Sequence, residues 1–284
     1  MNQLIKIYEK TITAIRKYPF IFFPFLLYAL LQAIALVIIY IAPRDPFNKI
    51  LAPPIRTFWG ERFLHYPTNF ILLPKLFSIA QFGLAVIIGS LITGLVVALV
   101  LNIFDKRKPG LRQGLFTAVK RYIPLILITF LVLALFRFST KFIVFLLTKY
   151  FLAGHERLLF LGGRLWFGPL LLLTNFACAI LIQALFIYSI PVLIIERKNF
   201  ITSLFRGVIL FKRWFMQSLI LVGLPMFAYL PILLLQFKTS YLINNFSPES
   251  ILLVTSLGIV VSSLVIDPLV IISTTFFYLS KTKK

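Results

Sequence analysis

Asp267 is the residue whose chemistry stands out, because it is the acidic side chain that lies within a long apolar run. It lies about 16 residues into the run 251–279 and directly precedes Pro268. An ionised carboxylate inside a bilayer is costly, and such residues commonly mark ion or proton sites. Asp267 therefore indicates either a proton- or cation-linked site or a buried, protonated side chain that hydrogen-bonds at a proline kink.

Asn175 and Gln183 are the polar side chains that could share a site with Asp267. They lie about two helical turns apart in the run 166–195, with Ala179 between them on the same face. Amides in membrane helices also hydrogen-bond across helix contacts without any further role. The two residues are therefore predicted either to join Asp267 in a polar site or to pack helices together.

Three basic residues, Arg137, Lys141 and Lys149, interrupt the apolar pattern of the run 122–151 and fall on roughly one helix face. The apolar segment between them is too short to cross a bilayer again. We expect one long helix that leaves the bilayer near Arg137. Its three cations would contact an anionic solute or lipid headgroup, or would extend to the interface as ordinary anchors.

The sequence contains no motif for hydrolytic, phosphate-binding or metal chemistry. No GxSxG, HExxH or glycine-rich phosphate loop occurs, and the two histidines, His65 and His155, lie in separate segments. We therefore expect no enzyme, no metal and no cofactor. The formal charge of +21 does not indicate nucleic-acid binding, because the basic residues gather at the ends of apolar runs.

The composition predicts an all-α integral membrane protein with six transmembrane helices. Hydrophobic residues make up 60% of the 284-residue chain and charged residues 13%, and several apolar runs exceed the length that a bilayer requires. The segment 43–75 holds six prolines, too many for a long regular helix, and is expected to be a loop. The predicted spans are 20–41, 77–104, 122–151, 166–195, 215–235 and 251–279.

A basic-basic-aromatic triplet precedes the first, third and fifth predicted spans: Arg16-Lys17-Tyr18, Lys120-Arg121-Tyr122 and Lys212-Arg213-Trp214. Each triplet ends a short segment with apolar residues on one face, which is typical of a helix in the membrane surface. The basic residues there, including Arg206, would bind anionic lipid or only fix topology. Three parallel two-span repeats, 1–104, 105–195 and 196–284, would explain the pattern within a single membrane domain.

The distribution of Lys and Arg predicts the orientation. The segments on the side of the two chain ends carry 18 of the 29 basic residues. By the positive-inside rule both termini face the cytoplasm, which places the chain in the inner membrane. Asp105 and Glu196 begin the basic exits of the second and fourth spans. We expect each acid to pair with a basic residue of a neighbouring repeat.

The stretch 189–196, Ser-Ile-Pro-Val-Leu-Ile-Ile-Glu, is followed by Ser203-Leu204-Phe205-Arg206-Gly207 and Lys212-Arg213-Trp214. This order resembles the six-span membrane domain attached to some glycerophosphoryl diester phosphodiesterases, and its stand-alone relatives of unknown function. The resemblance implies a six-helix membrane bundle. It implies no phosphodiesterase activity, because that chemistry belongs to a separate soluble domain.

These observations lead to three functional hypotheses. The first is a non-enzymatic accessory or scaffold protein in membrane or envelope processes, in contact with the bilayer and with anionic lipids on its cytoplasmic face. The second is a small transporter, or the membrane subunit of one, that uses Asp267. The third is a membrane enzyme that acts on lipid.

Overall fold

The computed structural model describes residues 2–153 and 164–283, and its described elements are helices. These elements form six continuous helices that are long and apolar enough to cross a membrane, which indicates a multi-pass membrane protein. His155 lies outside the described residues. The six helices, named spans 1 to 6 below, are Pro19–Ile41, Asn69–Phe104, Tyr122–Lys149, Gly168–Ile195, Phe215–Phe237 and Ser250–Thr282.

Several spans are built from more than one helical element. Span 1 contains η1 (Pro19–Ile21) and α2 (Phe23–Ile41), and span 3 lies within α7 (Tyr122–Ala153). Span 2 joins α4 (Asn69–Leu84), the π-helical η3 (Ala85–Gly89) and α5 (Ser90–Phe104); span 4 joins most of α9 (Arg164–Phe186) to α10 (Ser189–Ile195). Span 5 joins α12 (Phe215–Met226), η5 (Phe227–Tyr229) and α13 (Leu230–Phe237), and span 6 joins α15 (Ser250–Val260), the π-helical η6 (Val261–Ile266) and α16 (Asp267–Thr282).

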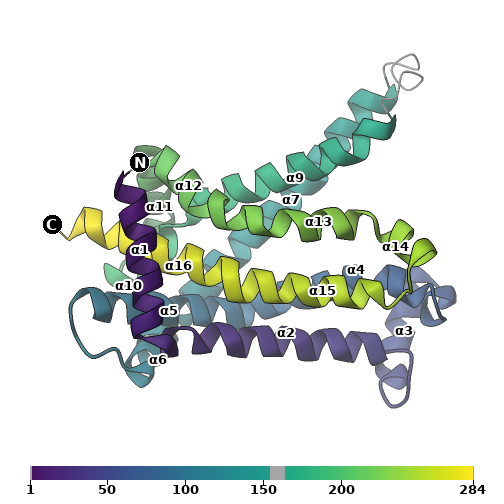
Figure 1. Cartoon of the computed structure of the whole chain (residues 1–284), viewed down its shortest axis with the longest axis horizontal. Helices are drawn as coiled ribbons and strands as arrows, with labels where there is room; N and C mark the ends of the chain where they lie inside the picture. The colour runs from purple at the N-terminus through teal and green to yellow at the C-terminus, as the bar shows by residue number, and fades with distance from the viewer. Residues whose placement is uncertain (1, 154–163, 284) are drawn as a thin grey trace.

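Three shorter helices precede the odd-numbered spans: α1 (Asn2–Lys17), α6 (Leu111–Lys120) and α11 (Phe200–Arg213). Figure 1 shows both chain ends at one end of the bundle, with α1 lying across the direction of the long helices. We call this end the terminal face. The helix α6 packs back on α5, α11 packs on α10, and α1 packs on α16.

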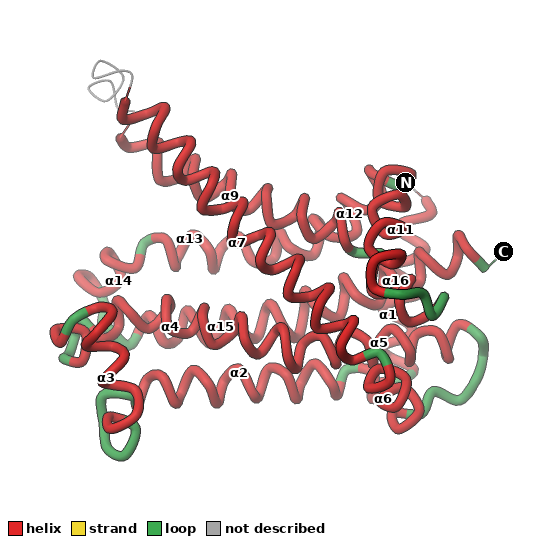
Figure 2. The backbone as a smooth tube through the Cα atoms, turned by 180° about the vertical axis from the view of Figure 1, so that it is seen from behind, coloured by secondary structure: helices red, strands yellow, loops and turns green. Residues whose placement is uncertain are grey.

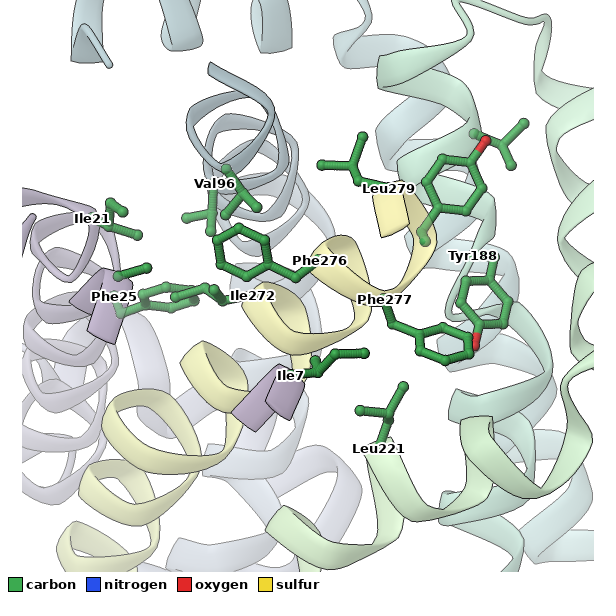
Figure 3. Packing of buried hydrophobic residues seen from close by; sticks show 14 of the residues in the cluster. Ile7, Ile21, Phe25, Val96, Tyr188, Leu221, Ile272, Phe276, Phe277 and Leu279 are labelled. Carbon is green, nitrogen blue, oxygen red and sulfur yellow. The ribbon is translucent and has the colours of Figure 1, made fainter. Parts of the chain in front are cut away.

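The even-numbered spans form the centre of the bundle near the terminal face. The helix α5 packs against both α10 and α16. Figure 3 shows Ile272, Phe276 and Phe277 of α16 surrounded by buried side chains from other helices, among them Val96 and Tyr188. Because these side chains interdigitate, the three even spans are held together where their chains leave the bundle.

The hairpin of α7 and α9 departs from the rest of the bundle. The two helices pack against each other, and Figures 1 and 2 show them rising together away from α2, α4 and α15. Little of span 3 is buried by other parts of the protein, and Phe138 is 68% exposed. The exposed apolar surface of this hairpin is suited to lipid or to another membrane helix.

The prediction of a loop over 43–75 is wrong in part. That segment contains α3 (Asn48–Trp59) and η2 (Glu61–Leu64), and span 2 begins at Asn69 rather than near residue 77. Pro53 and Pro54 lie inside α3 but are both exposed, while Ala52 and Ile55 hold its buried face. A proline inside a helix removes its own backbone donor and crowds the carbonyl four residues earlier. Here both prolines lie on the exposed side of a short helix, where water can satisfy the freed carbonyls. A further short helix, α14 (Thr239–Asn245), lies in the polar segment before span 6.

Candidate functional site

Each even-numbered span loses regular α-helical geometry at a point within its length. Span 2 does so at η3, span 4 at the turn Ile187–Tyr188, and span 6 at η6. Pro191 cannot donate to the carbonyl of Ile187, and Pro268 cannot donate to that of Leu264, which explains the second and third interruptions.

The interruption in span 2 has no proline and is held by hydroxyl groups instead. The carbonyl of Ile87 accepts hydrogen bonds from Ser90 Oγ at 3.1 Å and from the Tyr122 phenol at 3.0 Å. The Tyr122 side chain comes from the start of span 3, so this contact fixes the depth at which α7 enters. Such π-helical segments within α-helices occur frequently at functional sites.

A cavity of about 380 Å³ lies where these three interruptions meet. Its lining includes Ala85 and Gly89 of η3, Ile187 and Pro191 at the break in span 4, and Asp267 at the start of α16. Spans 1 and 3 complete the wall. The volume falls in the range of roughly 300–1,000 Å³ that is typical of small-molecule sites.

Asp267 is the acidic group of this cavity, and its carboxylate has no hydrogen-bond donor among the described residues. No Lys, Arg or His is found in the described lining either. Thr129 also lines the cavity, and its Oγ1 is buried without a partner in the described part of the chain. A buried polar atom without a partner carries a free-energy penalty, so a ligand or water that pairs with it would be favoured. The other polar lining residues are Tyr28, Thr93, Gln183, Thr274 and Thr275.

The structure brings together two of the three residues predicted for a polar site. Asp267 and Gln183 line the same cavity, and Ala179 lines it as well. Asn175 is absent from the lining, because it lies about two turns further along α9 towards the far end of the bundle. Its Oδ1 is buried and has no partner among the described residues.

The three basic residues of α7 do not form one cluster of contacts. Arg137 donates to the carbonyl and hydroxyl oxygens of Ser78, at 2.9 and 2.8 Å, and lies over the ring of Phe82. It therefore joins span 3 to span 2. Lys141 and Lys149 are exposed further along the helix.

The basic residues at the terminal face make several distinct contacts. Arg121 donates to the carbonyl oxygen of Arg197 at 3.1 Å, and Arg206 pairs with Glu196 at 3.1 Å. Lys120 lies over the ring of Phe116 at 4.3 Å. Arg213 lies over the ring of Trp214, while Lys212 is exposed.

The expectation that both exit acids pair across repeats is correct for one of them. Lys283 Nζ lies 2.8 Å from Asp105 Oδ1 and so joins the ends of spans 6 and 2. Glu196 instead pairs with Arg206, which follows it within the same proposed repeat. The reason is geometric: α11 folds back on α10 and carries Arg206 to the carboxylate.

Several polar contacts near the cavity were not expected from the sequence. Gln32 donates to Ser263 Oγ at 3.1 Å and accepts from Gln81 at 3.2 Å, which joins spans 1, 6 and 2 beside η6. Gln32 is almost fully buried. The available signal was the presence of single amides within apolar runs, the same signal that singled out Asn175 and Gln183.

No family model, curated protein or solved structure matches this chain.

Proposed function

We propose that this protein binds a small solute in the cavity around Asp267 and acts as a small transporter or as the membrane subunit of one. The observation that carries the proposal is the convergence of Asp267 and Gln183, from spans 6 and 4, on one cavity. Intramembrane ionisable residues that face a cavity typically lie on solute or ion pathways. The interruptions of spans 2, 4 and 6 support it further, because broken membrane helices form the binding sites of many transporters.

Accessibility of the cavity tests this proposal. Ala179 lines it, and its replacement by Cys adds one sulfur atom without removing a polar group. The native Cys178 would first be replaced by Ser. We expect a membrane-impermeant thiol reagent to label Ala179→Cys in sealed vesicles, from at least one side.

The matched control is Val222→Cys, since Val222 is fully buried in span 5. It should stay unlabelled under the same conditions. If Ala179→Cys also stays unlabelled from both sides, the cavity is closed to solutes and the transport proposal is wrong.

We further propose that the terminal face is cytoplasmic, that the membrane is the inner membrane, and that α1, α6 and α11 lie in its surface against anionic lipid. In α11, Ser203 and Gly207 face the protein, while Ile201 and Phe205 are exposed. In α6, Gly114 is buried and Phe116 is exposed. Apolar side chains that face away from the protein on a helix with basic residues suit a lipid surface.

Two features support the proposal of three two-span repeats. Each short helix packs on an even-numbered span, and for α6 and α11 it is the span that directly precedes. Lys106 and Arg197, which follow the exit acids, both have φ of 55°. The repeats would place spans 2, 4 and 6 around a central axis. Within residues 189–214, whose sequence resembles a six-helix membrane domain, Gly207 of α11 packs against Ser189 of α10.

A second candidate function, an accessory or scaffold protein, is favoured by the α7–α9 hairpin. Phe142 and Phe145 on its outer half are more than half exposed. A photo-crosslinking amino acid at position 142 should join the chain to a second protein if the hairpin is a docking arm. Adducts with lipid alone would contradict this function.

A further inference from the structure

We propose that the cavity around Asp267 takes a protonated organic amine, that is, an ammonium group that carries apolar substituents. This inference rests on the proposed function and names the class of solute. It is argued from the charge, the hydrogen-bonding capacity, the size and the walls of the cavity.

Three of the hydroxyl groups in the lining can offer a ligand only an acceptor. The hydroxyls of Thr93, Thr274 and Thr275 each donate to a carbonyl of their own helix, at 2.8, 2.6 and 2.7 Å. What they can offer a ligand is therefore an oxygen lone pair. Together with the carboxyl group of Asp267, these three hydroxyls suit an N–H donor. Tyr28, Thr129 and Gln183 can donate as well as accept, so they can also bind a polar substituent of the ligand.

The charge of the lining points in the same direction. Asp267 is the acidic group among the described lining residues, and no basic residue there pairs with it. An ammonium group would donate a charge-assisted hydrogen bond to the Asp267 carboxylate in a site of low polarity. A ligand with a phosphate or carboxylate would place two negative groups together.

The spread of the side-chain oxygens around the cavity argues against Mg²⁺ or Ca²⁺ as the preferred occupant. Mg²⁺ and Ca²⁺ need six or more oxygen ligands within roughly 2.6 Å of one point. Here the side-chain oxygens come from five helices around a cavity of about 380 Å³. An organic cation fills such a volume, and it requires one strong acceptor rather than a closed shell.

The walls supply the apolar and aromatic surface that an organic cation needs. Phe25, Tyr28, Phe136 and Phe186 line the cavity from spans 1, 3 and 4. Aromatic faces attract ammonium groups and also accommodate their apolar substituents. The cavity thus combines one carboxylate with aromatic walls.

Three probes with one apolar body and different charges test the class of solute: adamantylamine, adamantanol and adamantanecarboxylate. Each would be added to the Ala179→Cys protein, in the Cys178→Ser background, before thiol labelling in lipid nanodiscs. We expect the amine to slow labelling at least tenfold, the alcohol to slow it weakly, and the carboxylate to have no effect. Equal protection by the amine and the carboxylate would overturn the proposal.

The reactivity of the same cysteine provides a second readout. Trimethylammonioethyl methanethiosulfonate is cationic, and sulfonatoethyl methanethiosulfonate is an anionic reagent of similar size. We expect the cationic reagent to react faster relative to its rate with free thiol, and Asp267→Asn to reduce this ratio. If the anionic reagent reacts faster than the cationic one with Ala179→Cys while Asp267 is present, each rate being taken relative to free thiol, the proposal is refuted. This outcome does not depend on whether Asp267→Asn folds.

The two proposals fail in different ways. If Ala179→Cys is labelled but the amine gives no protection, the solute class is wrong and the cavity can still serve transport. If Ala179→Cys is not labelled by either reagent, the proposed function itself fails.

Discussion

The phenol of Tyr278 donates a hydrogen bond to the carboxylate of Glu196, and this contact joins the end of span 6 to the exit of span 4. Tyr278 is fully buried among Tyr188 and other aromatic residues, so its hydroxyl has few alternatives. Glu196 also pairs with Arg206 of α11 at 3.1 Å. One carboxylate therefore holds three elements at the terminal face.

Replacement of Glu196 by Gln is expected to lower thermal stability, because it removes the ion pair with Arg206 and weakens the acceptor of the Tyr278 hydroxyl. The Glu196 side chain is 17% exposed, but that of Arg206 is 48% exposed, and solvent screens part of the ion pair. We expect a loss of about 1–2 kcal/mol in the free energy of unfolding, mostly from the hydrogen bond to a charged group. Thermal unfolding in detergent measures it.

Glu61→Gln is the matched control for this prediction. Glu61 pairs with Arg56, but the two side chains are 67% and 55% exposed. A largely exposed pair of this kind contributes about 0–1 kcal/mol. Equal effects of the two substitutions would show that the Tyr278 contact adds no stability.

Two residues with left-handed backbone conformation, directly after the ends of spans 2 and 4, give a second prediction. Lys106 and Arg197 both have φ of 55°, a conformation that costs a non-glycine residue about 1–2 kcal/mol. The amide of Arg107 donates to the carbonyl of Asn102 at 2.8 Å, which is a helix-end motif that favours glycine at position 106. We expect Lys106→Gly and Arg197→Gly each to raise the free energy of unfolding by about 0.5–1 kcal/mol. This gain is smaller than the strain that is relieved, because glycine loses more chain entropy on folding.

The control for these two substitutions is Lys108→Gly, and the quantity compared is the free energy of unfolding. Lys108 follows Lys106 without a positive φ, so Lys108→Gly should give no gain. Unfolding of the three variants would be followed under one set of conditions. Stabilisation at one exit only would argue against equivalent structures in the second and third proposed repeats.

Arg137 provides a third prediction, on the position of the α7–α9 hairpin. Its guanidinium donates twice to Ser78, so Arg137→Ala should release span 3 from span 2 and increase the mobility of the hairpin. We expect faster amide hydrogen exchange in α7 beyond residue 137 and a loss of about 1–3 kcal/mol in stability. Lys141→Ala, one turn further along, should change neither quantity.

An equal increase in exchange for the two variants would contradict this role of Arg137. It would mean that both cations act only as exposed interface anchors. The difference between the variants therefore separates a tertiary contact from a topological signal.

The sequence predicted the helical class and the number of spans because a bilayer imposes a length on apolar runs. It located Asp267 and Gln183 for a related reason, since isolated polar residues in such runs are conspicuous. It did not predict that Asn175 lies outside the cavity. Asn175 lies about two turns from Gln183 along α9, and the sequence does not show that the cavity lies at the Gln183 end, next to the break at Ile187–Tyr188.

Other features depended on tertiary geometry that no local pattern contains. Tyr28 and Thr129 meet Asp267 across a cavity although they lie in different spans. Glu196 forms an ion pair with Arg206 rather than with a residue of another proposed repeat, because α11 folds back on α10. The helix α3 forms despite Pro53 and Pro54, because these prolines face away from its buried side.

The contact between Gly207 and Ser189 gives the last prediction. A Cβ atom at position 207 would overlap Ser189 Oγ and would lie 3.0 Å from the Ser189 backbone nitrogen. Ser189 is fully buried, so α10 cannot move aside without disturbing the centre of the bundle. Gly207→Ala should therefore force α11 away from α10, and with it Arg206 from Glu196.

We expect Gly207→Ala to cost about 1–3 kcal/mol in the free energy of unfolding, as is usual for overpacking. Gly83→Ala is the control, because nothing lies within 4 Å of a Cβ atom at that helical position. That substitution should be neutral or slightly stabilising, since alanine favours the helix. A double variant with Ser189→Ala, which removes the hydroxyl but leaves the backbone contact, should recover only part of the loss. Full recovery would show that the hydroxyl alone, rather than the close approach of the two helix backbones, makes glycine necessary at position 207.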